Sequence, residues 1–294
     1  MNDSPDFSVE RDEPVGAVLA RWRKRKKIPG QALGDRVGMS QAKISRLETG
    51  ASTPDPNDVR RLAQGLDLPS AEVERLVDLA EHSSNQLVDW RPTHLGLANR
   101  QRDVRQLETS ARELRIFQPA VVVGLVQTSE YARALMSSLQ TELADDQIAD
   151  SAIVVSEAVA ARMQRNQVLA EPDRQFHFLM SESVLSNKVC GPAEMLAQIE
   201  RLREVSRQPN VNLRIVRRDA DWPLAPYHGF VLMDDRCVLV DLFNTSLMSR
   251  GRRTVRHYQR VFDAIERIGT TRIDPILDEY QGLYARMLLP SPAV

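Results

Sequence analysis

The segment GMSQAKISRLETG, residues 38–50, limits the fold more than any other part of the sequence. Ser40 is a good helix N-cap and Gly50 suits the left-handed residue that ends a helix, so a short helix is predicted between them. At about 100° per residue, Ile44 and Leu47 share one narrow inward face. Because only two residues anchor this helix, it needs neighbouring helices for support and presents the rest of its surface to a partner.

Four more short helices are predicted around this segment. Their apolar residues recur at helical spacing: Val15, Val18, Leu19 and Trp22; Leu33 and Val37; Val59, Leu62, Ala63 and Leu66; and Val73, Leu76, Val77 and Ala80. Prolines and capping residues in TPDPND and DLPS mark the last two starts. The pattern predicts an all-α, five-helix domain over 14–82, after a disordered tail (1–13) and before a linker (83–101).

The second and third helices have the layout of a helix-turn-helix, with a scaffold helix at about 30–37 and a turn at Gly38 and Met39. The major groove of DNA admits a helix, and Gln, Lys, Ser and Arg side chains bond base edges or phosphates. The predicted DNA-contacting residues are Gln31, Gln41, Ala42, Lys43, Ser45 and Arg46. Glu48 is expected to be structural, pairing with an arginine of the first helix such as Arg21 or Arg25.

The charge distribution agrees with a polyanion partner for the first domain. The whole chain has a formal net charge of −1, but residues 14–68 hold eleven Lys or Arg and five Asp or Glu, which gives 11 − 5 = +6 there. The rest of the chain therefore carries −7. A basic unit on an acidic body favours a nucleic-acid partner for the first part only, although a solvated basic helix face would explain RWRKRKK alone.

The remainder predicts one α/β or α+β domain with a small sheet over residues 102–289. Helices are predicted at about 102–115, 128–143, 150–170, 192–208, 252–268 and 274–288. Short β-like runs are QFHFLM (175–180), NLRIVR (212–217), GFVLMD (229–234) and CVLVDLF (237–243). Leu277, Tyr280, Tyr284 and Met287 form a helical stripe that fits a dimer interface or core packing equally well.

Several function classes find no support in the sequence. The two cysteines, Cys190 and Cys237, are unpatterned, and the five histidines are scattered, so we expect no disulfide, metal site or cofactor. No stretch approaches the roughly 18 apolar residues of a membrane span, so a cytoplasmic, nucleoid-associated protein is expected. A serine in SES (181–183) with His228 and Asp241 lacks the G-x-S-x-G elbow of a hydrolase.

Residues 15–66 resemble the Cro/phage-repressor type of helix-turn-helix domain, the XRE family. The stretch VLARWRKRKKIPGQALGDRVGMSQAKISRLETG places eight residues on that family's pattern: Leu33, Gly38, Ser40, Ile44, Ser45, Leu47, Glu48 and Gly50. Two departures stand out. Pro29 and Gly30 replace the usual Ser and Gln of the scaffold helix, and Gly34 replaces the usual alanine, which lowers helix propensity but keeps a tight approach between helices.

The remainder resembles an actinobacterial C-terminal domain of uncharacterised function, found in antitoxin-like transcriptional regulators. The phrases that carry this likeness are LETSARELRIFQPAVVVGLVQTSEYARAL (107–135), EAVAARMQRNQVL (157–169), FLMSESVLSNKVCGPAEMLAQIERLREVSRQPNVNLRIV (178–216) and YHGFVLMD (227–234). The resemblance implies a regulatory domain that senses a small molecule or a small partner protein, and it supplies no defined ligand.

Two functions are therefore compared. The first is a DNA-binding transcriptional regulator, a homodimer on double-stranded DNA, with a sensing second domain. The second is an enzyme, hydrolytic or transferase, tethered to DNA, and the absence of any catalytic spacing disfavours it. For a regulatory site, the polar residues Gln127 and Tyr131 are predicted to face Tyr227 and His228, and structural packing of the first two is the competing interpretation.

Overall fold

The computed structural model describes residues 14–52, 54–85, 87–90, 97–143, 151–243 and 245–289. The chain divides after Leu87 into two compact units, and each has its own hydrophobic core. Within the described residues, none of the helices combines the length and the apolar character that a membrane span requires.

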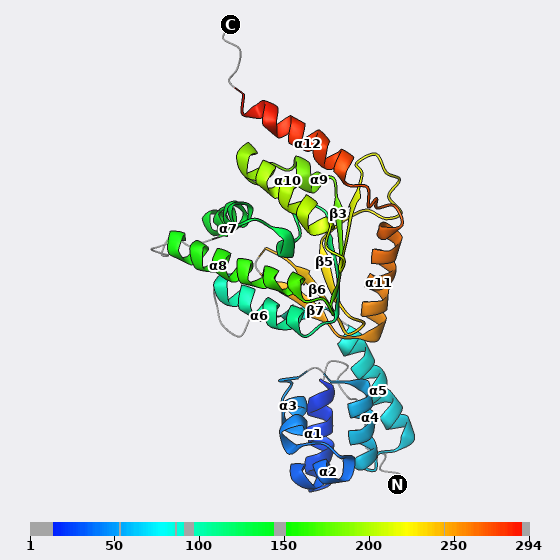
Figure 1. Ribbon diagram of the computed structural model, residues 1–294. Coiled ribbons are helices and arrows are strands. Elements are labelled where there is room, and N and C mark those ends of the chain that lie inside the picture. Colours follow the sequence, from blue (N-terminus) through cyan, green and yellow to red (C-terminus); the bar gives the residue numbers. More distant parts are fainter. Residues whose placement is uncertain are drawn as a thin grey trace. The chain divides into compact units, whose positions relative to one another are not determined.

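The first unit consists of the five predicted helices (Figure 1). They are α1 (Val15–Arg25), α2 (Gly30–Val37), α3 (Gln41–Glu48), α4 (Pro56–Gly65) and α5 (Ser70–Asn85). The apolar residues that predicted these helices form the core, and Trp22 packs against it half-buried. The prediction of an all-helical unit is confirmed. It succeeded because the helical spacing of apolar residues and the residues that begin and end helices agree along the whole unit.

Glycines allow the backbones of this unit to approach closely. A Cβ on Gly16 of α1 would lie 2.0 Å from the Leu47 carbonyl oxygen of α3, and one on Gly34 of α2 would lie 2.4 Å from the Met39 carbonyl oxygen. Gly38 ends α2 with a φ of 63°, and Gly50 follows α3 with a φ of 74°, both in the left-handed region. These positions hold α3 against α1 and α2 at a short distance.

The second unit is built around one mixed sheet of seven strands in the order β1-β7-β6-β5-β2-β3-β4. The strands are β1 (Val88–Trp90), β2 (Glu113–Gln118), β3 (Gln175–Ser181), β4 (Val211–Val216), β5 (Phe230–Met233), β6 (Cys237–Asp241) and β7 (Ser246–Ser249). Its α-helices are α6 (Leu97–Thr109), α7 (Ser129–Leu143), α8 (Ser151–Arg165), α9 (Ser183–Ser186), α10 (Pro192–Ser206), α11 (Arg252–Glu266) and α12 (Asp274–Met287). Two 3-10 turns, η1 (Gly124–Val126) and η2 (Asn166–Ala170), complete it.

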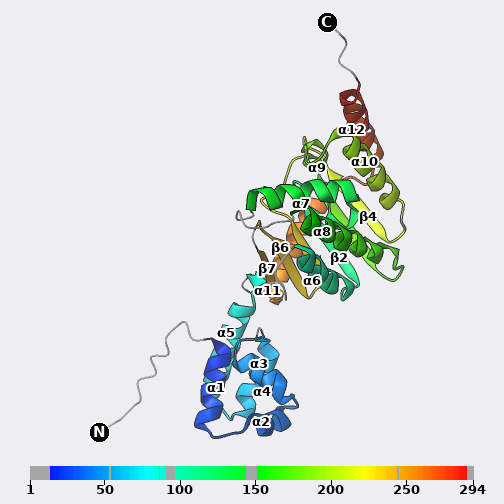
Figure 2. The same ribbon diagram turned by 90° about the vertical axis from the view of Figure 1, so that its left-hand side faces the viewer.

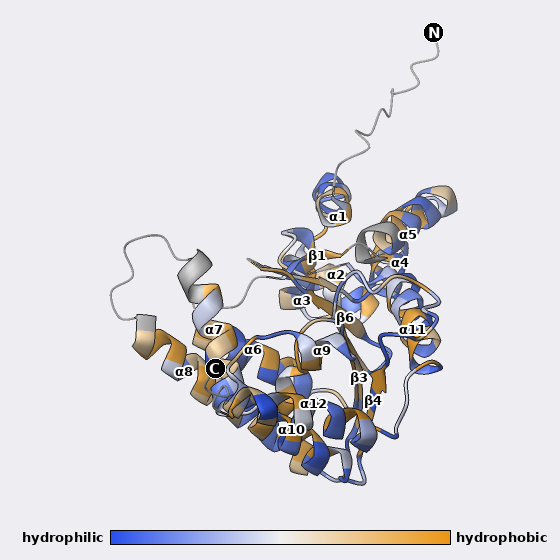
Figure 3. Cartoon of the chain, turned by 90° about the horizontal axis from the view of Figure 1, so that it is seen from above, coloured by the Kyte–Doolittle hydropathy of each residue, from blue (hydrophilic) through white to orange (hydrophobic). Residues whose placement is uncertain are grey.

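The sheet separates two helical layers. In the ribbon, α11 covers one face, and α6, α7, α8 and α10 lie on the other (Figures 1 and 2). Strands β2, β3 and β4 are parallel and are joined by helical crossovers, whereas β5, β6, β7 and β1 add antiparallel pairs. Hydrophobic and hydrophilic residues both colour α11, as expected for a helix with one buried face (Figure 3).

Three strands differ from the sequence prediction. The range 102–115 was predicted as one helix, but helix α6 ends at Thr109 and strand β2 begins at Glu113. The range 83–101, predicted as a linker, contains strand β1. Strand β7 was not predicted. Strands β1 and β2 pair with strands that are distant in the chain, β7 for the first and β3 and β5 for the second, and β7 itself is only four residues long, so local periodicity did not reveal them.

The stripe on α12 is core rather than a dimer interface. Leu277, Tyr280 and Tyr284 are buried within their own unit, and only Met287 of the four is exposed. The Tyr284 hydroxyl donates to the Leu185 carbonyl oxygen at 2.6 Å, so its polar end is satisfied as well. Core packing therefore explains the three buried residues.

Candidate nucleic-acid interface

Helix α3 is fixed on one side by an ion pair with α1. The Arg23 guanidinium donates to both carboxylate oxygens of Glu48, at 2.6 and 2.7 Å, and also to the Ile28 carbonyl oxygen at 2.9 Å. Both side chains are mostly buried, with 17% and 11% exposed. The hydrogen bond to Glu48 raises the pKa of Arg23. Glu48 is thus structural as predicted, although its partner is Arg23 rather than Arg21 or Arg25.

The other side of α3 is tied to α4. The Lys43 ammonium lies 2.6 Å from an Asp58 carboxylate oxygen, and Asp58 is largely buried. The backbone amide of Lys43 also donates to the capping Ser40 hydroxyl at 3.3 Å. The charge of Lys43 is therefore partly neutralised by its own unit, which sequence spacing could not indicate.

Between these two flanks lies the outward face of α3. Ala42, Ser45 and Arg46 are exposed there, opposite the buried Ile44 and Leu47. The Arg46 guanidinium takes part in none of the hydrogen bonds or ion pairs found among the described residues. A free, exposed guanidinium on a rigid helix is the group best suited to bidentate recognition of a base edge or phosphate.

Thr49 shares this outward face and was missed by the sequence analysis. It follows α3, is exposed, and donates from its hydroxyl to the Ser45 carbonyl oxygen at 2.8 Å. The 3.6-residue periodicity from Ala42 and Ser45 would have placed it there, had the helix been extended by one residue. Thr49 therefore adds a methyl group and a hydroxyl to the outward face of α3.

The first residues of α2 and α3 lie side by side. A Cβ on Gly30 would be 3.5 Å from the Gln41 Cγ, and Gln41 is exposed. Gln31 is exposed too, and its amide donates to an Asp35 carboxylate oxygen at 3.0 Å. Both predicted glutamines are therefore at the surface beside the N-terminus of α3, where free amides favour anions.

The end of α1 adds a cluster of basic side chains to the same unit. Lys24 and Lys27 are exposed and have no side-chain partner within the described ranges. Arg25 stacks over the Trp22 ring, with its Cζ 5.7 Å from the centroid, and Lys26 donates to the Asp67 carbonyl oxygen at 3.1 Å. Such cations suit contacts to phosphates, which fix orientation without reading sequence.

Gln127 and Tyr131, predicted for a regulatory site, are buried structural residues. The Gln127 amide donates to the Val122 carbonyl oxygen at 2.7 Å, and its oxygen accepts from Arg162 at 2.6 Å. The Tyr131 hydroxyl accepts from the Val122 amide at 3.1 Å. Both side chains thus hold the turn before η1, and burial raises the pKa of Tyr131 to about 12.

Tyr227 and His228 do not face that pair. Tyr227 is 89% exposed, and the His228 ring packs at 5.9 Å from the ring of Tyr258, which belongs to α11. Tyr131 belongs to α7, which lies on the opposite face of the sheet from α11 (Figures 1 and 2), and it is part of the core there. The four residues therefore do not form one site, because a sequence pattern in two loops does not show on which face of a sheet each loop packs.

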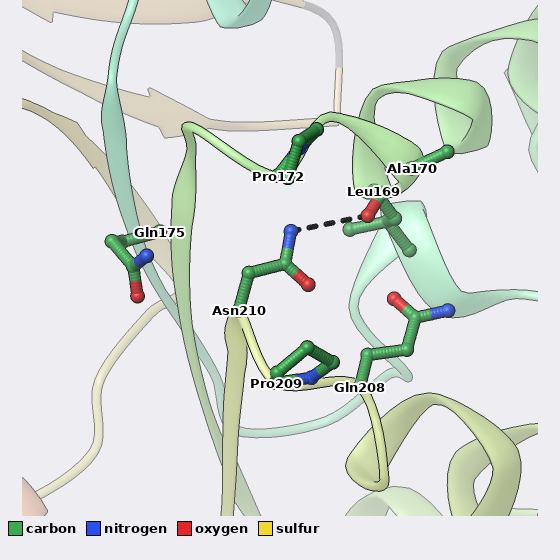
Figure 4. A pocket seen from close by; sticks show the side chains of 7 residues that line it. All are labelled: Leu169, Ala170, Pro172, Gln175, Gln208, Pro209 and Asn210. Atoms are coloured by element: carbon green, nitrogen blue, oxygen red, sulfur yellow. Dashed lines mark hydrogen bonds between the residues drawn. The ribbon is translucent and has the colours of Figure 1, made fainter.

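A pocket of about 440 Å³ lies elsewhere in this unit, between η2 and the beginnings of β3 and β4 (Figure 4). Its lining residues are Leu169, Ala170, Pro172, Gln175, Gln208, Pro209 and Asn210. The Asn210 amide donates to the Leu169 carbonyl oxygen at 3.2 Å, as the dashed line shows. The residues predicted for a regulatory site do not contribute to it.

The residues considered for a hydrolase triad have other partners. The Ser181 hydroxyl donates to the Pro119 carbonyl oxygen at 2.5 Å, and Asp241 accepts from Arg100 at 3.0 Å. The two cysteines are free thiols. Among the described residues, no group of three His, Cys, Asp or Glu side chains is arranged to hold a metal ion.

Comparison with known proteins identifies both units. No curated protein matches the chain. One solved structure, an archaeal chromatin protein, TrmBL2, described as showing a novel mode of DNA binding, aligns with 11% identity, a TM-score of 0.31, and coverage of 79% of this chain and 72% of that chain. A likeness of this degree does not bear on the fold or the function. Residues 14–76 match the family described as a helix-turn-helix domain. Residues 101–275 match the domain of unknown function DUF5753, and the chain belongs to that family.

Proposed function

We propose that this protein is a sequence-specific DNA-binding transcriptional regulator of the Cro/phage-repressor type, in which α3 enters the major groove. The observation that carries the proposal is the outward face of α3. Its exposed Ser45 and Arg46 stand on a helix clamped on one flank by Glu48 and on the other by Lys43. A base-reading helix requires rigid support of this kind, because ordering a mobile helix on binding would cost conformational entropy and offset the favourable contacts with DNA.

We further propose that the protein is an antitoxin-like regulator that binds as a homodimer and acts in the cytoplasm at the nucleoid. One helix-turn-helix unit covers one half-site, and specific affinity normally comes from two units about one helical turn apart. The second unit then regulates rather than catalyses, in response to a small molecule or a small partner protein. An effector changes DNA affinity only if it binds two conformations differently, typically with a coupling of about 1–3 kcal/mol.

The experiment is selection of DNA ligands for the full chain from a random-sequence library, followed by titration of the selected duplex against random duplex. A regulator of this type is expected to prefer the selected site by at least about 10³-fold. The selected sequence should contain an inverted repeat. Equal affinity for both duplexes at every salt concentration would refute sequence-specific binding.

A further inference from the structure

The outer face of α11 carries a row of arginines, defined here as the α11 arginine row: Arg252, Arg256, Arg260 and Arg267, just beyond the helix. All four are exposed, and their intervals of four, four and seven residues place them on one side of the helix. With a rise of about 1.5 Å per residue, neighbours in the first three lie about 6 Å apart, and the row extends over about 22 Å.

The row has no counter-ions of its own. None of its four guanidinium groups takes part in a hydrogen bond or ion pair among the described residues. The one acid on the same side of α11, Asp263, instead accepts from Arg115 of β2 at 3.2 Å. Other arginines of this unit are closely paired, as where Arg203 donates to Asp274 at 2.6 Å and to Asp278 at 2.9 Å.

This arrangement is unfavourable for the helix itself. Like charges four residues apart destabilise a helix, and cations in the first turn oppose the helix dipole. The first turn of α11 contains no acidic residue, and it begins with Arg252 and Arg253. Packing does not require the row either, because the buried side chains of α11 are Val255, Phe262 and Ile265 on the inner face. The row therefore lowers the local stability of α11, and no interaction described inside the unit compensates for this loss.

The chemistry of the row fits a polymer of regularly spaced anions. The second unit, residues 88–294, holds 26 Lys or Arg and 26 Asp or Glu, which gives 26 − 26 = 0, so the row concentrates positive charge on a unit that is neutral overall. No large apolar side chain stands among the four arginines to anchor a partner helix. Duplex DNA presents one phosphate charge per about 1.7 Å of axis, so a row of this length meets several phosphates at once.

We infer that the α11 arginine row binds the phosphate backbone of DNA, as a second and sequence-independent contact in addition to that of the helix-turn-helix. The inference rests on the proposed function for its choice of partner. Because both units belong to one chain, DNA held by the first unit is presented to the second at a high effective concentration. DNA is thus favoured over an acidic protein as the occupant.

The test compares full-length variants on a random-sequence DNA duplex at several salt concentrations. One variant replaces three members of the row: Arg252→Gln, Arg256→Gln and Arg260→Gln. A charge-matched control replaces three exposed arginines of other helices and helix ends, Arg105→Gln, Arg207→Gln and Arg286→Gln. A third variant carries lysine at the three row positions, and circular dichroism with thermal melting checks the fold of each.

The row variant is expected to lower the slope of log K against log salt by about 2.7, at about 0.9 per lost phosphate contact. Between 50 and 200 mM salt, the wild type then loses about 40-fold more affinity than the row variant. The control and the lysine variant should keep most of the wild-type slope. An unchanged slope in the row variant, or an equal fall in the control, overturns the inference, and an acidic protein becomes the occupant to examine.

The same titrations separate this inference from the proposed function. If Arg46→Ala leaves binding to a selected duplex unchanged while the row variant reduces binding to all duplexes, the row inference stands and the proposed role of α3 fails. If Arg46→Ala removes site preference and the row variant keeps its slope, the proposed function stands and the row inference fails.

Discussion

Replacing Gly34 by alanine should destabilise the helix-turn-helix, although alanine is the better helix former. The intrinsic gain in helix propensity is about 1 kcal/mol. Against it, the new Cβ would lie 2.4 Å from the Met39 carbonyl oxygen, which belongs to the turn between α2 and α3. The Met39 amide already donates to the Gly34 carbonyl oxygen at 2.9 Å, so the turn cannot move without weakening that bond.

Overpacking of this kind costs typically 1–3 kcal/mol, and here a backbone atom rather than a flexible side chain must yield, so the upper half of that range applies. Subtracting the propensity gain leaves a net loss of about 1–2 kcal/mol for Gly34→Ala. The matched control is Gly30→Ala in the same helix, where the nearest atom is the Gln41 Cγ at 3.5 Å, an ordinary contact. That change should stabilise by about 0.4–1 kcal/mol.

Hydrogen exchange of the full chain, read on peptides from α2 and α3, measures the local stability of this unit without interference from the other. The reasoning predicts faster exchange in Gly34→Ala and equal or slower exchange in Gly30→Ala. If Gly34→Ala exchanges as slowly as the control, the turn accommodates a Cβ. The close approach at Gly34 would then not be what fixes α3.

Three further predictions concern charged side chains. Asp58→Asn should release Lys43 for phosphate contact, raising affinity for random duplex and steepening the salt slope by about 1; an unchanged slope would mean that Lys43 does not reach DNA. Glu48→Gln should cost about 1.5–3 kcal/mol of stability in denaturant unfolding because a mostly buried charged pair is lost. The control Glu74→Gln removes an exposed charged pair and should leave stability nearly unchanged. Similar losses in the two variants would contradict the role of burial. Burial alone would raise the pKa of Asp234, but the hydrogen bonds from two backbone amides and an arginine outweigh it and lower that pKa. The ionised Asp234 carboxylate therefore stabilises the fold above the ordinary value of 3.8, and this stabilisation is lost as pH falls through the folded-state pKa. Asp234→Asn should be less stable than the wild type at neutral pH and should match it in acid.

The first unit could be predicted almost fully from the sequence, since the apolar residues of each helix recur at a spacing that agrees with the packing, and two of the helices also have side-chain caps. Ser40 and Asp55, for example, cap α3 and α4 through their side chains. The second unit was predicted less well. Strand β2 lies between β5 and β3, whose residues are far away in the chain, and its alternation of polar and apolar residues lasts only from Glu113 to Ile116, which is too short to identify a strand directly after a helical pattern.

The candidate site was predicted in part for the same reason. The exposure of Arg46 follows from helical period alone, whereas the pairing of Lys43 with Asp58 depends on how α4 crosses α3. Which arginine of α1 meets Glu48 likewise depends on the angle between two helices, and Arg23 satisfies it. On the sheet, Gln127 and His228 were assigned to one site, since sequence alone does not tell on which face each loop packs.

The central claim is that the outward face of α3 reads DNA sequence, and the most direct measurement is the base preference of Arg46→Ala at every position of the selected site. Wild type and variant are titrated, as full chains, against the site and all its single-base-pair substitutions. The account predicts that the variant loses about 1–3 kcal/mol on the selected site and becomes indifferent to substitution at one base pair of each half-site, while its preferences elsewhere remain. A uniform loss across all duplexes, random DNA included, would reassign Arg46 to a phosphate, and unchanged affinity would contradict the claim that this face of α3 enters the groove.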